Sequence, residues 1–381
     1  MRTIPEDLKS QHLFVLVGGN PLPNYAAIRL LRCAGGHVYL VHTAQTNKIA
    51  DRICQVAGLE LGQDAVKVLV DDGNAAEMRA KVLRQAAQKQ GVGLNYTGGT
   101  KHMALHVFQG LIAAGPRLTL SYLDAETLSM RIEQGDGVTR SFAIGLAVSL
   151  RFQELLALHG RTAAALETDL LCPEVYPGLP RVPYDRWREW WSSASRSMGG
   201  RTAAIPLPTD SAFDPLRAHW GDATTLGDLA NHWRTDVATL AKWFGEAGLE
   251  SYVLWSVRRV AADAQLGETA KNVKLNEIDF EFDVVAMRGY QLFAISCANS
   301  KDKGTIKLKL MEAYVRARQM GGDEARVAVV CRAPANDPLS SPRKIEQEMV
   351  EQLGADGKIR VFGAEHMAQL QTHLLNWFTA K

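Results

Sequence analysis

The sequence has few cysteines, no long hydrophobic run and almost no net charge, and each absence excludes a class of protein. The five cysteines are scattered and form no Cys-x-x-Cys pair, so we expect neither a disulfide framework nor a zinc ribbon. The longest apolar run, residues 142–150, is too short to span a bilayer, and the N-terminus lacks the apolar core of a signal peptide. These absences predict a cytoplasmic protein with no membrane partner.

A net charge of +2 on 381 residues does not by itself indicate a nucleic-acid or membrane partner. Any such binding must come from a local patch. The chain is long enough for two or three domains, and its 46% hydrophobic and 22% charged residues are ordinary for a globular protein.

The first half of the chain alternates apolar strands with helices, which predicts a Rossmann-like α/β domain with a mainly parallel sheet. Ligands of such sheets bind beyond the carboxyl ends of the strands. The expected strands are residues 12–19, 37–43, 65–71, 92–96, 118–123 and 128–134, and the expected helices are residues 24–33, 45–57, 75–88 and a helix beginning near residue 100.

Two of these strand ends carry glycine-rich loops, Gly18-Gly19-Asn20-Pro21 and Thr97-Gly98-Gly99-Thr100-Lys101. Glycine allows a sharp turn that exposes backbone N–H groups, and the following helix N-terminus attracts negative charge. The threonine hydroxyls and the lysine add to this, so the second loop predicts an anion site. It is neither a Walker loop nor a Gly-x-Gly-x-x-Gly fingerprint, and an ordinary strand-to-helix turn capped by threonine has the same spacing.

Residues 151–222 read as a connector, because prolines cluster there and three tryptophans follow closely, Trp187, Trp190 and Trp191. Residues 224–246 resemble a small helix-turn-helix, with Thr225 capping the first helix and Thr235 or Asp236 capping the second. The second helix has Lys242 as its single basic residue. A helix that binds DNA usually carries more positive charge than this.

The C-terminal third combines carboxylates with lysines. A helix from residue 248 to about residue 264 precedes an expected strand over residues 274–287. Alternation places four acids on one face of that strand, namely Glu277, Asp279, Glu281 and Asp283. After a second strand, residues 291–297, come Lys301, Lys303, Lys307 and Lys309, then an amphipathic helix and a strand over residues 325–331. Carboxylates suit Mg²⁺ or Mn²⁺ and lysines attract phosphates, so metal-dependent phosphodiester cleavage is one interpretation. A solvated acidic edge strand beside a solvated basic loop is the other.

Residues 1–150 resemble a CARF domain, the CRISPR-associated Rossmann fold that senses cyclic oligoadenylates. The resemblance rests on the two glycine loops and on the strand at residues 38–43. It implies a ligand site in these segments, formed by Gly19, Asn20, Pro21, Thr43, Thr97, Gly98, Gly99, Thr100 and Lys101.

Residues 223–381 resemble a helical lead-in followed by a PD-(D/E)xK nuclease, a restriction-endonuclease-like α/β domain. The resemblance rests on Gly248-Leu249-Glu250, Asn276-Glu277-Ile278-Asp279, Asp283-Val284-Val285 and Ile295-Ser296-Cys297-Ala298. It implies that Glu250 and Asp283 hold the metal ion.

The next nuclease motif normally reads Asp/Glu-x-Lys, but here Ser296 and Ala298 occupy the positions of the acid and the lysine. Three explanations stay open: a degenerate nuclease, a lysine that has migrated to Lys301 or Lys303, or an inactivating Lys-to-Ala change at position 298. Losing one electrostatic group of this kind costs about a hundred- to thousand-fold in rate. We therefore expect weak or absent cleavage by this chain.

Together the segments resemble the CARF-fused nucleases that cut DNA or RNA when a type III CRISPR system makes its second messenger. The resemblance implies a receptor for a cyclic oligoadenylate, cyclic tetra-adenylate being the expected form, that allosterically activates a Mn²⁺- or Mg²⁺-dependent endonuclease. A ring with an even number of units has two-fold symmetry, so a homodimer is expected to hold it across its axis. Two other functions stay open, namely a DNA-binding transcription regulator and a ring nuclease that degrades the messenger.

Overall fold

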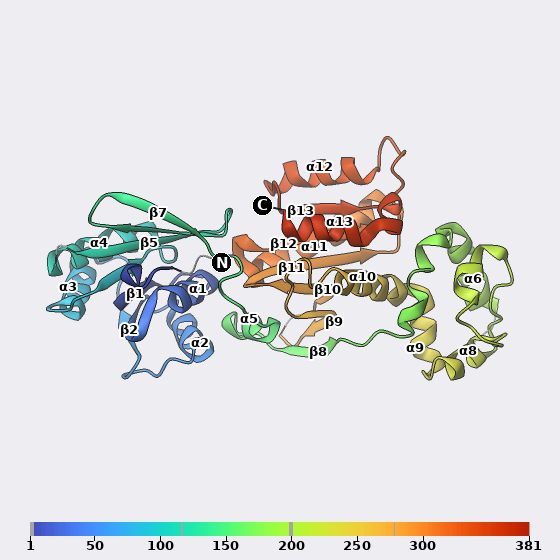
Figure 1. The fold of residues 1–381 in the computed structure, drawn as a ribbon, viewed down its shortest axis with the longest axis horizontal. Helices are drawn as coiled ribbons and strands as arrows, with labels where there is room; N and C mark the ends of the chain where they lie inside the picture. Colours follow the sequence, from blue (N-terminus) through green and yellow to red (C-terminus); the bar gives the residue numbers. More distant parts are fainter. Residues whose placement is uncertain (1–3, 116, 198–200, 278, 381) are drawn as a thin grey trace.

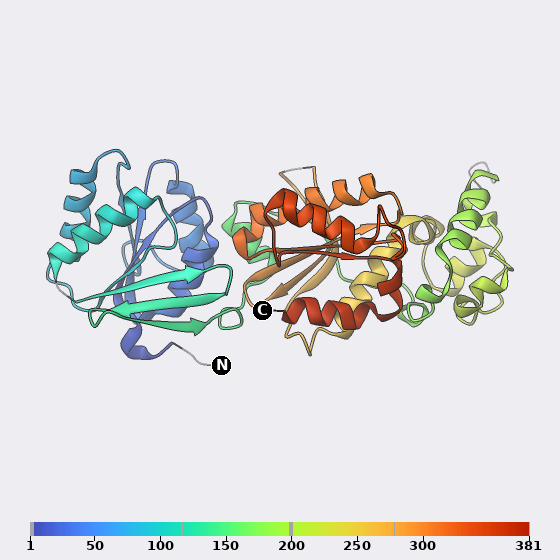
Figure 2. The same ribbon diagram turned by 90° about the horizontal axis from the view of Figure 1, so that it is seen from above.

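The structure is a computed structural model that describes residues 4–115, 117–197, 201–277 and 279–380. Three units follow one another along the molecule (Figure 1). An N-terminal α/β unit lies at one end, a second α/β unit in the middle, and a helical unit at the other end, as the view from above also shows (Figure 2). Within the described ranges, no helix is both long and apolar enough to cross a membrane. Ile278, from one of the nuclease-like motifs, lies outside the described residues.

The first unit is a seven-stranded sheet in the order β3-β2-β1-β4-β5-β6-β7. Strands β3, β2, β1, β4 and β5 pair in parallel, whereas the β5–β6 and β6–β7 pairs are antiparallel. Helices α1 and α2 cover one face, and α3 and α4 cover the other. The elements are β1 (Ser10–Leu16), α1 (Leu22–Leu31), β2 (Arg32–His42), α2 (Asn47–Ala57), β3 (Ala65–Leu69), α3 (Ala75–Ala86), β4 (Val92–Asn95), α4 (Lys101–Ala114), β5 (Leu118–Asp124), β6 (Ser129–Gln134) and β7 (Val138–Ala143). The predicted Rossmann-like sheet is confirmed.

The second unit is a six-stranded sheet in the order β13-β12-β11-β10-β9-β8, parallel from β13 to β11 and antiparallel beyond. Helices α5, α11 and α12 pack on one face, and α10 and α13 pack on the other. The elements are α5 (Phe152–Leu158), β8 (Ala163–Glu167), α10 (Gly248–Arg259), β9 (Thr269–Leu275), β10 (Glu281–Arg288), β11 (Gln291–Ala298), α11 (Lys303–Gly321), β12 (Arg326–Cys331), α12 (Pro342–Leu353), β13 (Ile359–Phe362) and α13 (Leu370–Thr379). Thus α5 and β8, expected in the connector, belong to this unit.

The single acidic strand expected over residues 274–287 is wrong, because the chain turns between β9 and β10. The backbone N–H of Asn276 donates to the carbonyl of Thr162, and the Glu277 carboxylate accepts from the backbone and hydroxyl of Thr162. These bonds keep Asn276 and Glu277 out of the pairing between β9 and β10. Consequently Glu277 and Asp279 do not share a strand face with Asp283.

The helical unit contains α6 (Tyr184–Ser197), α7 (Asp214–Arg217), α8 (Leu226–His232) and α9 (Val237–Lys242). The rings of Trp187, Trp190 and Trp191 lie 5.3, 5.1 and 6.0 Å from the ring of Phe244, so these partly buried tryptophans pack against the core of this unit. Thr225 and Asp236 cap α8 and α9, as predicted for the two short helices.

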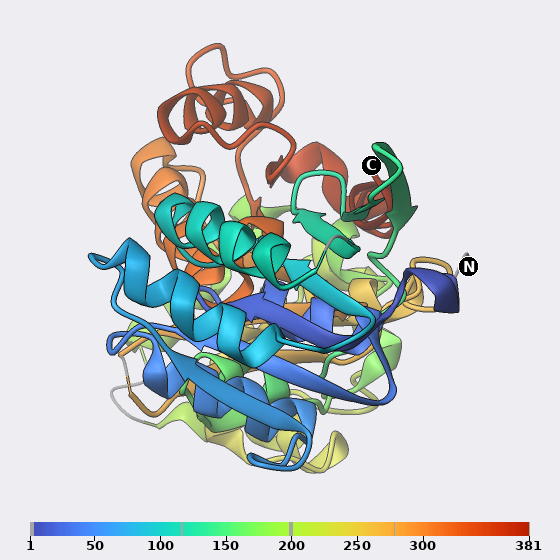
Figure 3. The ribbon, with the colours of Figure 1, turned by 90° about the vertical axis from the view of Figure 1, so that its left-hand side faces the viewer.

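The first and second units are in direct contact. One apolar core continues from the α1–α2 face of the first sheet through α5 to the α11 face of the second. The linking chain is held where the backbone N–H of Leu150 donates to the carbonyl of Gly289, 3.1 Å away, in the β10–β11 turn. Figure 3, seen from the first unit, shows its sheet and helices in front of the second unit.

Candidate functional site

An open cavity of about 780 Å³ lies at the carboxyl ends of β1 to β4, the edge of a parallel sheet where ligands bind. Its lining comes from the loops that follow these four strands and from helices α2, α3 and α4. The lining includes Gly18, Gly19, Thr43, Gln45, Thr46, Asp71, Asp72, Lys81, Gly99, Thr100 and Met103. Four residues of the predicted ligand site are therefore in the cavity wall: Gly19, Thr43, Gly99 and Thr100.

The backbones of the two glycine loops are in close contact with each other beside this cavity. A Cβ on Gly18 would lie 2.8 Å from the backbone nitrogen of Gly99, and one on Gly98 would overlap the carbonyl oxygen of Leu16. Gly99 also has a φ of +72°, a conformation that favours glycine. The glycines thus let two backbones meet and present their amides at one place.

The threonines of the second loop are engaged within the protein. Thr100 caps α4, since its Oγ1 accepts from the backbone N–H of Met103 at 3.0 Å and donates to Asp72 Oδ1 at 2.9 Å. Thr97 Oγ1 accepts from the backbone N–H of Leu123 at 2.7 Å, which ties the loop to β5. Thr97 and Lys101 are not among the residues that line the cavity, and Lys101 is exposed at the start of α4.

Asn20 and Pro21 turn away from the cavity. Pro21 is buried at the start of α1, and Asn20 Oδ1 accepts from the backbone N–H of Leu22 at 3.1 Å. The amide nitrogen of Asn20 faces Gly322 of the second unit. The sequence interpretation missed Asp71, Asp72 and Lys81, although these residues directly follow β3 or lie on the next helix; Lys81 forms an ion pair with Glu77.

The second candidate site lies on the second sheet, where β10 and β11 separate. Asp283 Oδ2 accepts from the hydroxyl of Ser296 at 3.0 Å and from the backbone N–H of Cys297 at 2.6 Å. The carboxylate therefore lies where the backbone pairing between β10 and β11 would otherwise continue. Its orientation is fixed by two donors from the neighbouring strand.

Glu250, in the first turn of α10, faces the same place. Burial, and next the negative charge of Asp283, raise the pKa of the Glu250 carboxyl to about 7. A bound cation would relieve this repulsion of the Glu250 carboxylate. A Mg²⁺ ion is commonly held by one or two carboxylates plus water and substrate phosphates, so the pair fits a single divalent ion. Among the described residues there is no group of three or more His, Cys, Asp or Glu side chains suited to a metal.

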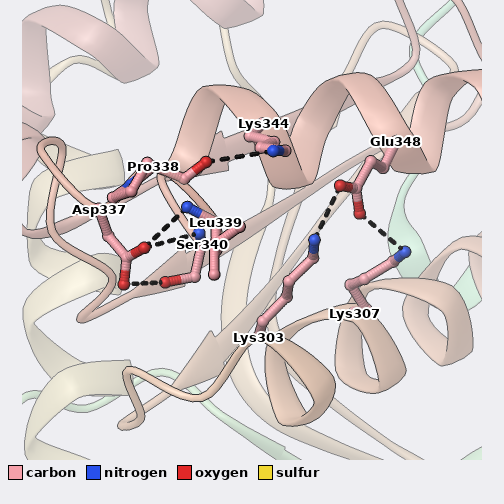
Figure 4. Close-up of polar contacts among 8 residues, drawn as sticks. All are labelled: Lys303, Lys307, Asp337, Pro338, Leu339, Ser340, Lys344 and Glu348. Carbon is pink, nitrogen blue, oxygen red and sulfur yellow. Dashed lines mark hydrogen bonds and ion pairs between the residues drawn. The ribbon is translucent and has the colours of Figure 1, made fainter.

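The lysines expected to replace the missing motif lysine lie elsewhere. Lys301 Nζ is 2.8 Å from both carboxylate oxygens of Asp185. Lys303 and Lys307 on α11 both donate to Glu348 of α12, at 2.7 and 3.2 Å (Figure 4). These ion pairs hold Lys301 and Lys303 away from Asp283, so the structure does not bring either of them to the site.

Lys309 is the lysine that α11 delivers to the site. Its Nζ donates to the carbonyl of Cys297 at 2.8 Å and lies 3.7 Å from Asp283 Oδ2. Ala298 is 1% exposed and packs in the core that α11 covers. A sequence signal existed, because Lys309 lies between Ile306 and Ala313 on the core-facing side of the helix, where a lysine is unusual.

A Rossmann-like unit with an open cavity, joined to a second α/β unit that carries a carboxylate pair, is the class of protein that this fold and these sites define. Residues 13–120 match the family model of the Card1 CARF domain, so the N-terminal unit is a CARF domain. A comparison with curated proteins found no match.

Three solved structures share the fold. Protein VC1899 from Vibrio cholerae is 15% identical, with a TM-score of 0.72 over 97% of this chain and 98% of that one. Can2 from Sulfobacillus thermosulfidooxidans, in complex with cyclic tetra-adenylate, is 18% identical, with a TM-score of 0.70 over 98% of this chain and 99% of that one. A type III CRISPR defence DNA nuclease activated by cyclic oligoadenylate is 17% identical, with a TM-score of 0.53 over 94% of this chain; this chain covers 54% of that nuclease.

Proposed function

We propose that this chain is a cytoplasmic receptor for a cyclic oligoadenylate, namely cyclic tetra-adenylate, that allosterically controls a metal-dependent endonuclease in type III CRISPR defence. The observation that carries the proposal is that one chain joins the CARF cavity to the Glu250–Asp283 carboxylate pair. The fold likeness to Can2, whose structure contains cyclic tetra-adenylate, supports the choice of ligand. We assign residues 1–150 to sensing and residues 223–381, together with α5 and β8, to cleavage, and the rest of residues 151–222 to the connector.

The CARF cavity suits a phosphate-linked ring because its donors are backbone amides. The Gly18–Gly19 and Gly98–Gly99 segments and the first turn of α4 supply them, and a helix N-terminus favours anions. Asp71 and Asp72 at the cavity edge repel phosphates, so we assign them to ribose hydroxyls or adenine amines. Lys101 stands beside the cavity as the charged contact to a phosphate.

A homodimer completes the ligand site in this proposal. The surface offers apolar side chains at helical spacing on two helices: Leu105 and Ile112 on α4 are 53% and 45% exposed, and Leu308 and Met311 on α11 are 68% and 49% exposed. Exposed apolar groups of this kind mark interaction surfaces. A second copy related by two-fold symmetry is the occupant that matches a two-fold symmetric ring.

In the nuclease-like unit, Glu250 and Asp283 would hold one Mn²⁺ or Mg²⁺ ion. When bound, such an ion polarises the scissile phosphate and lowers the pKa of a water. The chain's own residues fix the geometry: Ser296 and the Cys297 backbone orient Asp283, and α10 positions Glu250. The substrate class is DNA or RNA.

The test is calorimetry with cyclic tetra-adenylate, followed by cleavage of mixed DNA and RNA in Mn²⁺ with and without the ligand. We expect binding with one ring per dimer, weaker binding for Lys101→Ala, and cleavage that requires the ligand and is abolished by Asp283→Asn. No binding by the wild type would refute the receptor. Linear adenylate products would identify a ring nuclease instead, and metal-independent duplex binding would identify a DNA-binding regulator.

A further inference from the structure

The nuclease-like site has a cation that does not come from the expected motif. Lys309 reaches the site from α11, eleven positions beyond Ala298, and its Nζ bonds the carbonyl of Cys297, the residue between the two altered motif positions. The ammonium group therefore stands at the motif, although its Cα lies on a helix.

The surroundings leave Lys309 able to meet a substrate. Its side chain is 42% exposed, while that of Asp283 is 16% exposed, so the lysine enters from the open side of the site. A small cavity of about 60 Å³ lies beside it, with Asp283, Ser296, Lys309 and Glu312 in its wall. The other three lysines of this segment are held by Asp185 and Glu348.

We propose that Lys309 is the catalytic cation of this site and replaces the lysine absent at position 298. This inference rests on the proposed nuclease function. In phosphodiester hydrolysis, the oxygen of a water bonds to phosphorus and one P–O ester bond breaks. The water loses one proton to solvent or a base, and the departing alkoxide gains one. Negative charge grows on the non-bridging oxygens in between, and a fixed ammonium beside them stabilises that charge.

The experiment compares full-length Lys309→Met, Lys309→Arg and the matched control Lys307→Met, which removes a lysine two positions away on the same helix. With cyclic tetra-adenylate and Mn²⁺, we expect Lys309→Met to lose about a hundred- to thousand-fold in cleavage rate. Lys309→Arg should keep part of the rate, and Lys307→Met should stay within about threefold of the wild type, because Glu348 still pairs with Lys303. Equal losses for the two methionine variants, or none for Lys309→Met, would overturn the proposal.

A second readout does not depend on cleavage. Calorimetry without substrate should show that Lys309→Met binds Mn²⁺ on the order of tenfold more tightly than the wild type. The reason is that the ammonium group beside Asp283, which repels the metal ion, is gone. A merely structural lysine would leave this affinity unchanged, and that result would count against the role. If the wild type neither binds the ring nor cuts, the proposed function fails, while the Mn²⁺ measurement still reports on Lys309.

An independent observation concerns the boundary between the units. Glu324, which follows α11, is 2% exposed, and neither of its carboxylate oxygens has a hydrogen-bond partner on another described residue. A Cβ added to Gly322 would lie 2.7 Å from Glu324 Oε2 and would overlap the amide nitrogen of Asn20. The carboxylate and the amide are therefore neighbours that do not form a bond.

We infer that the Asn20–Glu324 pair couples the ligand cavity to Lys309. Asn20 directly follows Gly19 of the cavity wall, and Glu324 lies three residues beyond the end of α11, the helix that carries Lys309. A small movement of the glycine loop brings the amide within bonding distance of a buried carboxylate that lacks a partner. An unsatisfied buried group of this kind strongly favours any arrangement that supplies its bond.

The test measures ligand binding and ligand-dependent cleavage separately in Asn20→Ala, in Glu324→Met, which has a similar size and no oxygen acceptor, and in the control Asn74→Ala, whose side chain caps α3. We expect both pair variants to bind cyclic tetra-adenylate within about threefold of the wild type and to lose most of the activation ratio, since coupling energies of this kind change affinities 5–150-fold. An unchanged activation ratio in both would overturn the coupling. Absence of ring binding by the wild type would instead refute the receptor itself.

Discussion

The Ser296 hydroxyl donates a hydrogen bond to Asp283 Oδ2, 3.0 Å away. Replacing Ser296 by aspartate adds a third carboxylate beside Asp283 and Glu250. We predict that Ser296→Asp binds Mn²⁺ on the order of tenfold more tightly, because ligand charge tunes the affinity of oxygen sites. Without metal the variant should unfold at a lower temperature, since like charges repel.

The neutral variant Ser296→Asn is the matched control, as it has a similar size and no charge. Calorimetry gives the Mn²⁺ affinities, and thermal unfolding with and without the ion gives the stabilities. Mn²⁺ affinities that do not differ between the aspartate and asparagine variants would show that no ion is held at this position.

Glu324 predicts a pH-dependent stability. Burial is the main cause that raises the pKa of its carboxyl from 4.5 to about 7 in the folded protein. Below pH 4.5 the group is neutral in both states and contributes nothing; above pH 7 it is charged in the folded state and costs up to about 3 kcal/mol. Glu324→Gln should therefore be more stable than the wild type at pH 8 and equally stable near pH 4.

Thermal or urea unfolding across pH 4 to 8 measures this difference. Glu351→Gln, an exposed site on α12, provides the control and should leave the pH profile unchanged. Parallel profiles for the wild type and Glu324→Gln would contradict the prediction.

We predict that the Thr100 side chain contributes both to the stability of the folded protein and to ligand binding. Its side chain caps α4 and donates to Asp72, so Thr100→Ala should lower the free energy of unfolding by about 1 kcal/mol. It should also weaken binding of cyclic tetra-adenylate, because the loop that presents the Gly99 amide loses its anchor. Thr100→Ser keeps the hydroxyl and should behave like the wild type in urea unfolding and in calorimetry. Similar losses for alanine and serine would exclude the cap as the cause.

The sequence predicted the first sheet well because its central strands are buried on both faces and read as apolar runs. It did not predict β7 or β8, whose residues are mostly exposed edge positions without a clear alternation. It merged β9 with β10 because the alternation of acids continues from Glu277 to Asp283, across the end of one strand and the start of the next. The alternation of polar and apolar residues indicates which side chains could share a strand face. It does not indicate where the chain reverses direction.

The two sites were predictable to different degrees. Glu250 and Asp283 followed from the nuclease resemblance, and the structure brings their charges close together. Lys309 was noted among the four lysines but not chosen as the replacement for the motif lysine, because 26 positions separate it from Asp283 and the packing of α11 on β11 joins them. Asn20 was assigned to the ligand from its place beside Gly19, yet the start of α1 turns it toward the second unit.

Gly289 controls how the linker docks on the second unit. It has a φ of +61°, and a Cβ there would overlap the carbonyl oxygen of Gly145. We predict that Gly289→Ala costs about 1–3 kcal/mol, from backbone strain alone, and frees residues 144–150 from the β10–β11 turn. Limited proteolysis should then cut this segment faster, while calorimetry should still detect ring binding by the CARF domain.

Gly135→Ala is the matched control, because a Cβ at Gly135 would meet no atom within 4 Å. It should leave both the proteolysis rate and the unfolding free energy unchanged. The contact at Gly289 also lies on the route between the two units, so loosening it should lower ligand-dependent cleavage more than ligand binding. Equal proteolysis of the two alanine variants would show that the linker is held by other contacts.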